Sequence, residues 1–239
     1  MTVARRPQAL LFDVFGTVVD WRGSIAREVR KLVRARGSPA SIDGGAFADR
    51  WRAGYVPAMQ RVRSGELAWQ SIDDLNRTIL DTVLPEFALR LPERDKRALN
   101  LVWHRLSPWS DAVAGLARLK RRHIVGTLSN GNVKLLVDMA KNARLPWDCV
   151  LSAELFRHYK PDPEVYLGAA ALLDLAPREV MLVAAHKEDL AAARRCGMRT
   201  AFVRRPLENG AGVAADVDDD PRCTFNADDV LDLARQLSC

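Results

Sequence analysis

The most constraining feature of the chain is a short apolar run that ends at an acidic residue. Residues 9–12, Ala-Leu-Leu-Phe, are followed at once by Asp13 and, three residues later, by Gly16. An apolar run of this length before a turn glycine predicts a buried central strand of a parallel sheet. Ligands of open α/β sheets bind beyond the carboxyl ends of the strands. The carboxylate of Asp13 is therefore expected at the mouth of a site.

The position of Asp13 allows two interpretations. Aspartate is one of the side chains that form covalent intermediates, so it could act as a nucleophile. It could equally do no more than cap the turn. Gly16 would let the chain turn sharply, and the backbone N–H groups of Val14 and Phe15 would then face an anion.

The pattern of the chain changes after residue 20 and again after residue 102. Residues 20–102 show amphipathic helical periodicity and are too numerous for an ordinary loop. Beyond them strands and helices alternate, which implies a parallel sheet with right-handed crossovers. Strands are expected at 123–129, 149–152, 179–185 and 200–203, and a last helix near 227–237. The sequence thus predicts an α/β fold with a Rossmann-like core, residues 1–19 and 103–239, and an inserted helical cap, residues 20–102.

Composition excludes several other classes of protein. The 239 residues are 48% hydrophobic and 28% charged, as in soluble globular proteins. No apolar run approaches about 20 residues and no signal peptide is expected, so neither a membrane partner nor export is predicted. The 4 cysteines lack CxxC spacing, which favours reduced thiols and a cytoplasmic location. The net charge of +6 is spread along the chain, so nucleic acid is not an expected partner, whereas small anions could be attracted.

Polar side chains also stand near the ends of three later predicted strands. Ser129 could donate to an anion near Asp13, or it could cap the following helix. Lys160 could neutralise two negative groups brought together, or it could be a surface lysine before a proline turn. Asp189 could hold or activate a water, or it could only stabilise the start of a helix through the dipole.

Four segments of the chain resemble the motifs of the haloacid dehalogenase superfamily. The first contains the family pattern of hydrophobic residues followed by Asp-x-x-x-Thr, here Asp13 and Thr17. The segments are, in chain order, residues 12–18, 128–132, 158–163 and 183–189. The resemblance implies that Asp13 attacks the substrate to form a covalent intermediate, that Thr17 hydrogen-bonds to it, and that Lys160 and Asp189 complete the catalytic group.

Two positions distinguish the branches of that superfamily. Its phosphatases usually carry a second acid two positions after the nucleophile, where this chain has Phe15. They also hold Mg²⁺ with a carboxylate at the position of Ala185, and a hard dication needs several oxygen ligands. A halide leaves as an anion and needs no general acid. The chain therefore resembles the type II L-2-haloacid dehalogenases, which implies catalysis without a metal or cofactor.

This resemblance implies further contacts with substrate. The cap of these enzymes supplies an arginine for the departing halide, and Arg52, after Trp51, matches it. Asn130 resembles the second halide contact, and Tyr166 matches a tyrosine that lines the site. Ser129, with the N–H groups of Val14 and Phe15, would hold the substrate carboxylate.

The fourth motif departs from well-known members of the family. They carry serine and asparagine where this chain has Ala184 and His186, and tryptophan where it has Glu188. His186 is expected to orient the water or to contact the leaving group, unless it is only a polar neighbour.

The resemblance predicts an enzyme that dehalogenates short L-2-haloalkanoic acids, haloacetates included, by hydrolysis. The reaction would pass through an aspartyl ester and give 2-hydroxy acids with inversion. The expected partner is a small anionic haloacid, and the family resemblance suggests a homodimer. The nearest alternative is a Mg²⁺-dependent small-molecule phosphatase of the same superfamily, and a more distant one is a non-catalytic binding protein that keeps the fold.

Overall fold

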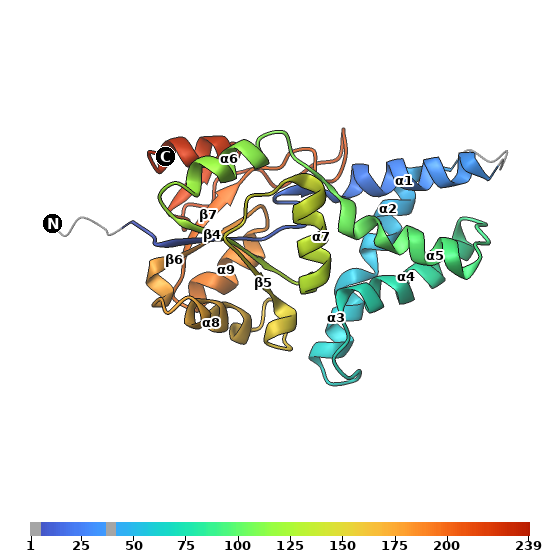
Figure 1. Ribbon diagram of the computed structural model, residues 1–239, viewed down its shortest axis with the longest axis horizontal. Helices are drawn as coiled ribbons and strands as arrows, with labels where there is room; N and C mark the ends of the chain where they lie inside the picture. The colour runs from blue at the N-terminus through green and yellow to red at the C-terminus, as the bar shows by residue number, and fades with distance from the viewer. Residues whose placement is uncertain (1–5, 37–41) are drawn as a thin grey trace.

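A six-stranded parallel sheet forms the centre of the molecule (Figure 1), which is a computed structural model that describes residues 6–36 and 42–239. The strands lie in the order β5-β4-β1-β6-β7-β8. Their bounds are β1 Ala9–Phe12, β4 Ile124–Ser129, β5 Cys149–Ser152, β6 Val180–Ala184, β7 Arg199–Val203 and β8 Phe225–Ala227. All four residues of β1 are fully buried. The central position of β1, between β4 and β6, places the residue that follows it at the middle of the carboxyl edge.

Helices cover both faces of the sheet. In Figure 1, α6 and α10 pack together on one face, and α8 and α9 lie on the other. The helices of the core are α6 Ala112–Leu119, α7 Val133–Ala143, α8 Pro163–Leu172, α9 Lys187–Arg195 and α10 Val230–Gln236. Two short 3₁₀ helices flank α8: η2 Ala153–Leu155 lies between β5 and α8, and η3 Pro177–Glu179 lies between α8 and β6. Pro163 stands at the first position of α8 and two acidic residues occupy the first turn of α9, both favourable at a helix start.

A separate group of helices lies to the right of the sheet in Figure 1. A short antiparallel pair, β2 Val19–Asp20 and β3 Ser107–Pro108, joins it to the core. The helices are α1 Trp21–Ala35, α2 Gly44–Ala53, α3 Tyr55–Arg63, α4 Ile72–Glu86, α5 Glu93–Asn100 and the 3₁₀ helix η1 Leu101–Arg105. Buried aromatic rings meet edge to face inside it, as Trp51 does with Phe47 and Trp103. These contacts give the helical group a core of its own.

The predicted fold class is confirmed, and the predicted strands agree with the structure to within one residue at each end. The short strands β2, β3 and β8 were not predicted. Residues 1–5 and 37–41, which fall within the predicted core and cap, lie outside the described residues. The cap bounds of 20–102 stay a prediction. No helix in the described part of the chain is long and apolar enough to cross a membrane.

A buried ion pair ties the loop after β1 to the rest of the core. Both outer nitrogens of Arg205 donate to the carboxylate of Asp111, each at 2.8 Å. Nε of Arg205 donates to the carbonyl of Thr17 at 2.8 Å. Oδ2 of Asp111 also accepts from the backbone N–H of Val230 at 2.8 Å. Four segments that are distant in the sequence are thus held at one point beneath the carboxyl edge of the sheet.

Candidate active site

The turn after β1 fixes where the carboxylate of Asp13 points. The backbone N–H of Asp13 donates to the carbonyl of Val183 at 3.0 Å, which continues the pairing with β6. Gly16 has φ +85°, and a Cβ there would lie 2.0 Å from Oε1 of Glu208. The turn therefore needs glycine both for its backbone conformation and for the close approach of Glu208.

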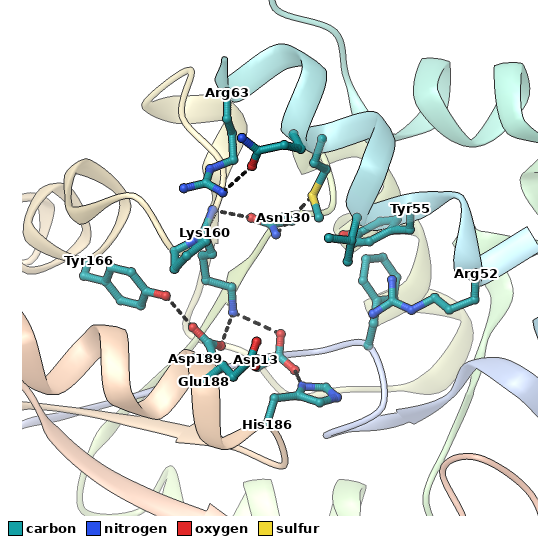
Figure 2. Close-up of a pocket in the computed structure, with 15 residues that line it drawn as sticks. Asp13, Arg52, Tyr55, Arg63, Asn130, Lys160, Tyr166, His186, Glu188 and Asp189 are labelled. Carbon is teal, nitrogen blue, oxygen red and sulfur yellow. Dashed lines mark hydrogen bonds and ion pairs between the residues drawn. The ribbon is translucent and has the colours of Figure 1, made fainter.

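Three donors hold the carboxylate of Asp13, and Figure 2 shows two of them, Lys160 and His186. Lys160 Nζ lies 3.0 Å from Oδ1, while Thr17 Oγ1 and His186 Nδ1 lie 2.8 Å and 3.1 Å from Oδ2. Burial alone would raise the pKa of Asp13, but the charges and hydrogen bonds of these donors hold it far below the usual range. Asp13 is therefore an anion at neutral pH, as a carboxylate nucleophile must be.

Lys160 joins Asp13 to a second carboxylate. Its Nζ donates to Asp189 Oδ2 at 2.5 Å, and Tyr166 donates its hydroxyl to Asp189 Oδ1 at 2.5 Å. Burial opposes the charge of Lys160, yet the two carboxylates raise its pKa above the ordinary value. Burial and the charge of Asp189 raise the pKa of Tyr166, so its hydroxyl keeps the proton it donates. The four side chains form one row from Asp13 to Tyr166 (Figure 2).

His186 links Asp13 to a third carboxylate, which the sequence analysis did not identify. Its Nε2 lies 3.0 Å from Oε1 of Glu208, which also accepts from Trp21 Nε1 at 3.1 Å. Burial works against the charged form of His186, but its two carboxylate partners raise the pKa to about 10. Burial would raise the pKa of Glu208, and the hydrogen bonds from His186 and Trp21 lower it. His186 is thus an imidazolium at neutral pH and donates from both ring nitrogens.

A cavity of about 290 Å³ opens over Asp13, between the core and the helices α2 and α3. This volume is at the small end of ligand pockets. Eight predicted site residues line it: Asp13, Phe15, Arg52, Asn130, Lys160, Tyr166, His186 and Asp189. The ring of Phe15 packs edge to face on Tyr55 and Trp103. The cavity therefore places an apolar wall beside an anionic nucleophile.

Arg52 projects from α2 into this cavity (Figure 2). Its guanidinium carbon lies 4.1 Å from the centroid of the Tyr55 ring, and it also lies near the rings of Phe15 and Trp21. Nη1 of Arg52 is buried and has no hydrogen-bond partner among the described residues. An unsatisfied buried donor is unfavourable by about 1–3 kcal/mol, and by more when it is charged. This atom is therefore a ready contact for an anion in the cavity.

The remaining predicted site residues have other surroundings. Asn130 Oδ1 accepts from the backbone N–H of Lys160 at 2.8 Å, and Asn130 Nδ2 lies 3.3 Å from the sulfur of Met59. Ser129 is fully buried and its Oγ accepts from the backbone N–H of Gly131 at 3.2 Å. Among the described residues, those that line the cavity do not include Val14, Thr17 or Ser129. Thr17 reaches the site through its hydrogen bond to Asp13, and the roles predicted for Val14 and Ser129 stay predictions.

An ion pair between the helical group and the core stands at the rim of the cavity. Arg63, at the end of α3, donates to Oδ1 of Asp162 from Nη2 at 2.6 Å and from Nε at 2.9 Å. Its Nη1 donates to Gln60 at 2.9 Å. Both Arg63 and Gln60 line the cavity, and neither was predicted. Within residues 6–36 and 42–239, no cluster of three or more His, Cys, Asp or Glu side chains could hold a metal ion.

Comparisons with known proteins give consistent matches. A family model described as haloacid dehalogenase-like hydrolase matches residues 7–197. The (S)-2-haloacid dehalogenase 4A of Burkholderia cepacia is 30% identical over 204 residues, which are 83% of each chain. Among solved structures, the L-2-haloacid dehalogenase PA0810 is 49% identical, with a TM-score of 0.92 over 97% of this chain and 99% of that one. The defluorinating L-2-haloacid dehalogenase Rha0230 is 43% identical, with a TM-score of 0.94 over 99% and 100%.

Proposed function

The chain belongs to the haloacid dehalogenase-like hydrolase family, as its motifs predicted, and we propose that it hydrolyses the carbon–halogen bond of short (S)-2-haloalkanoic acids. Its similarity to proteins named (S)-2-haloacid dehalogenase supports this activity. The observation that carries the proposal is the arrangement across the cavity. Anionic Asp13 lies on one side, and on the other lies the buried Nη1 of Arg52, which has no hydrogen-bond partner in the part of the chain that the structure describes.

The first step is a displacement at the 2-carbon of the substrate. A carboxylate oxygen of Asp13 forms the new C–O bond from behind while the carbon–halogen bond breaks. The halide leaves with the bonding electrons toward Arg52 and Asn130, so no proton donor is needed. Ser129 and the backbone N–H groups of Val14 and Phe15 are the proposed contacts of the substrate carboxylate. Positioning of nucleophile and substrate can supply about 7–11 kcal/mol of the barrier reduction.

The second step is hydrolysis of the ester on Asp13. Water attacks the carboxyl carbon of Asp13 and gives a proton to Asp189, which the ammonium of Lys160 and the hydroxyl of Tyr166 hold in place. The bond between that carbon and the substrate oxygen then breaks, and the 2-hydroxy acid leaves. One displacement at the 2-carbon gives net inversion, so an (S)-haloacid yields a D-2-hydroxy acid.

Two features of the site weigh against the alternative of a Mg²⁺-dependent phosphatase. Phe15 stands where a phosphatase would place its general acid, and its ring is packed among other aromatic rings. Ala185 offers no carboxylate where a metal ligand would stand, and Mg²⁺ is usually bound through carboxylates. We also infer that residues 20–102 act as a cap over the cavity, and we retain the predictions of a homodimer and a cytoplasmic location.

The proposed mechanism can be tested by single turnover in ¹⁸O-labelled water. Excess enzyme and (S)-2-chloropropionate should give a first product that carries oxygen from Asp13 and not from the solvent. Asp13→Asn is the matched control, because it keeps the size of the side chain and removes the charge. Label in the product of the first turnover would refute the covalent ester.

A second test is a panel of chloro-, bromo- and fluoroacetate and both 2-chloropropionate enantiomers, assayed for halide release with EDTA present. Of the two 2-chloropropionate enantiomers, the (S)-enantiomer alone is expected to release halide. Phosphate release from phosphate esters that stops with EDTA, together with no halide release, would favour the phosphatase.

A further inference from the structure

We propose that Thr17 and His186 form the oxyanion site for hydrolysis of the ester on Asp13, and that Glu208 is the residue that positions His186 for this task. The proposal rests on the proposed function, since it needs a covalent ester. It assigns different tasks to the two oxygens of Asp13. It also gives a role to a carboxylate that lies outside all four sequence motifs.

The two oxygens of Asp13 differ in how many donors they face. Oδ2 accepts from both Thr17 and His186, whereas Oδ1 accepts from Lys160 alone among the described residues. Each carboxylate oxygen has about two lone-pair directions for acceptance. Both directions are used at Oδ2, and one is left at Oδ1. Oδ1 is therefore the atom that attacks the 2-carbon, and Oδ2 becomes the carbonyl oxygen of the ester.

Hydrolysis then places negative charge on Oδ2. When water bonds to the carboxyl carbon and passes a proton to Asp189, the C=O electron pair moves onto Oδ2. As the pair returns, the bond to Oδ1 breaks. Oδ1 leaves with the product and takes a proton from Lys160 Nζ, 3.0 Å away, which Asp189 restores. The hydroxyl group that water leaves on the carboxyl carbon loses its proton to solvent, which restores the anion of Asp13. One proton and one halide are thus released per turnover, and atoms and charge balance without any further reactant.

Two donors already point at the oxygen that gains this charge. Thr17 Oγ1 accepts from the backbone N–H of Ala185 at 2.9 Å, so its own proton is directed to Oδ2 at 2.8 Å. His186 Nδ1–H is directed to the same oxygen from 3.1 Å. Donors that are in place before the charge develops stabilise the transition state strongly, and loss of one typically slows turnover by about 10²–10³-fold.

Glu208 holds His186 in the required orientation and charge state. Its Oε1 binds Nε2 of His186 at 3.0 Å and is anchored by Trp21 Nε1 at 3.1 Å. Glu208 also packs against Gly16, in the turn that carries Asp13. A carboxylate on each ring nitrogen favours the doubly protonated imidazolium, the only form in which both nitrogens donate. The raised pKa of His186, about 10, agrees with this arrangement.

Other charged groups near His186 are already paired or more distant. Lys187 pairs with Asp216, and Arg205 pairs with Asp111. Glu188 lines the catalytic cavity beside His186, and Arg52 acts electrostatically on Glu208. The carboxylates that contact the ring directly are those of Asp13 and Glu208. In the ester, Asp13 carries no charge, so at that stage the titration of His186 should respond chiefly to Glu208.

The test separates the two chemical steps in Glu208→Gln and His186→Ala, the second of which removes the donor to Oδ2. Rapid-quench measurements with (S)-2-bromopropionate would follow the burst of halide, the 2-hydroxy acid, and the covalent adduct by intact-protein mass spectrometry. We expect the halide burst to stay within about 3-fold of wild type in both variants. Hydrolysis should slow by about 10-fold or more, so that the adduct accumulates. The alkaline limb of the hydrolysis rate should move to lower pH in Glu208→Gln and disappear in His186→Ala.

Asp216→Asn is the matched control, since it removes a carboxylate near His186 that contacts Lys187 instead. It should leave both steps and the pH profile unchanged. The proposal is overturned if the halide burst slows as much as hydrolysis, or if no adduct accumulates in either variant. An unshifted pH profile in a folded Glu208→Gln variant would overturn the role of Glu208. Failure of the wild-type protein to release halide from any haloacid would instead refute the proposed function, and this proposal with it.

Discussion

Replacement of Arg205 by methionine should strongly destabilise the core. The side chains of Arg205 and Asp111 are only 7% and 8% exposed, and they share two hydrogen bonds of 2.8 Å. Arg205→Met would leave the carboxylate of Asp111 buried without its counter-charge. Removal of one partner of a buried pair is unfavourable by about 3–5 kcal/mol. For a chain of this size, each kcal/mol lowers Tm by roughly 2–4 °C, so a fall of about 6–20 °C is expected.

The neighbouring residue provides a matched control. Arg204 forms ion pairs too, but its two partners are exposed: the side chains of Asp219 and Asp228 are 64% and 80% exposed. Exposed ion pairs contribute about 0–1 kcal/mol, so Arg204→Met should lower the free energy of unfolding by no more than that. Urea unfolding followed by circular dichroism would measure both variants. Equal effects of Arg204→Met and Arg205→Met would refute the reasoning.

A second replacement tests whether the loss of stability in Arg205→Met comes from the uncompensated charge of Asp111. Asp111→Asn keeps an oxygen for the N–H of Val230 but removes the charge, so Arg205→Met with Asp111→Asn should be more stable than Arg205→Met alone.

The pH dependence supplies an independent check. Burial opposes the charge of Asp111, but in the wild-type protein Arg205 lowers its pKa. The pair therefore stabilises the fold above the unfolded pKa of about 4, and this contribution is lost as the pH falls through the lower folded value. In Arg205→Met the carboxyl group can bind a proton, so the difference from wild type should shrink as the pH is lowered from 7 toward 4. A difference that stays constant with pH would contradict this account.

Three further predictions concern the site and its surroundings. Arg52→Leu should lower kcat/KM for halide release by about 100-fold or more with little loss of stability, because it removes the proposed halide contact; a two-fold effect would exclude that role. His104→Gln should lower the free energy of unfolding at pH 6, and by less above the ordinary histidine pKa of about 6.5. Burial opposes the charge of His104, but two aspartates raise its pKa, and a raised pKa stabilises the fold only while the proton is bound. Urea unfolding at several pH values would measure this. Gly16→Ala should lower the free energy of unfolding by about 1–2 kcal/mol, because residue 16 has a left-handed backbone conformation. The added Cβ should also displace Glu208, so the covalent adduct should accumulate. An unchanged Tm would contradict the predicted loss of stability.

The parts of the fold that were predictable from sequence are those with local signals. The strand β1 is an apolar run that stops at Asp13, and β6 lies in an apolar run, residues 180–185, that stops at His186. The helices that follow these strands show their own periodicity. The strand β8 has only three residues, two of them partly exposed, so its apolar pattern is too short to detect. It is defined by pairing with β7, which is a tertiary contact.

The residues of the candidate site also differ in whether a local signal in the sequence identifies them. Asp13 and Lys160 stand in segments whose motifs are readable in the chain, whereas Arg52 was identified only through the family resemblance. Glu208 follows β7 in a stretch without regular periodicity. It reaches the site because Gly16 leaves space for its carboxylate and Trp21 binds it. That recruitment joins Glu208 to residues 16–21, which are far from it in the sequence, so no local pattern predicts it.

The central place of β1 has a consequence for biosynthesis. The ribosome makes β1 first, but its neighbour β4 begins only at Ile124 and its other neighbour β6 only at Val180. At a synthesis rate of about 5–20 residues per second, β6 is made roughly 10–30 seconds after β1. The helices α1 to α5 contact one another over short sequence separations, so they can fold during that interval. In the nascent chain, the apolar strand β1 therefore has unpaired edges. It is the segment most prone to aggregation before synthesis is complete.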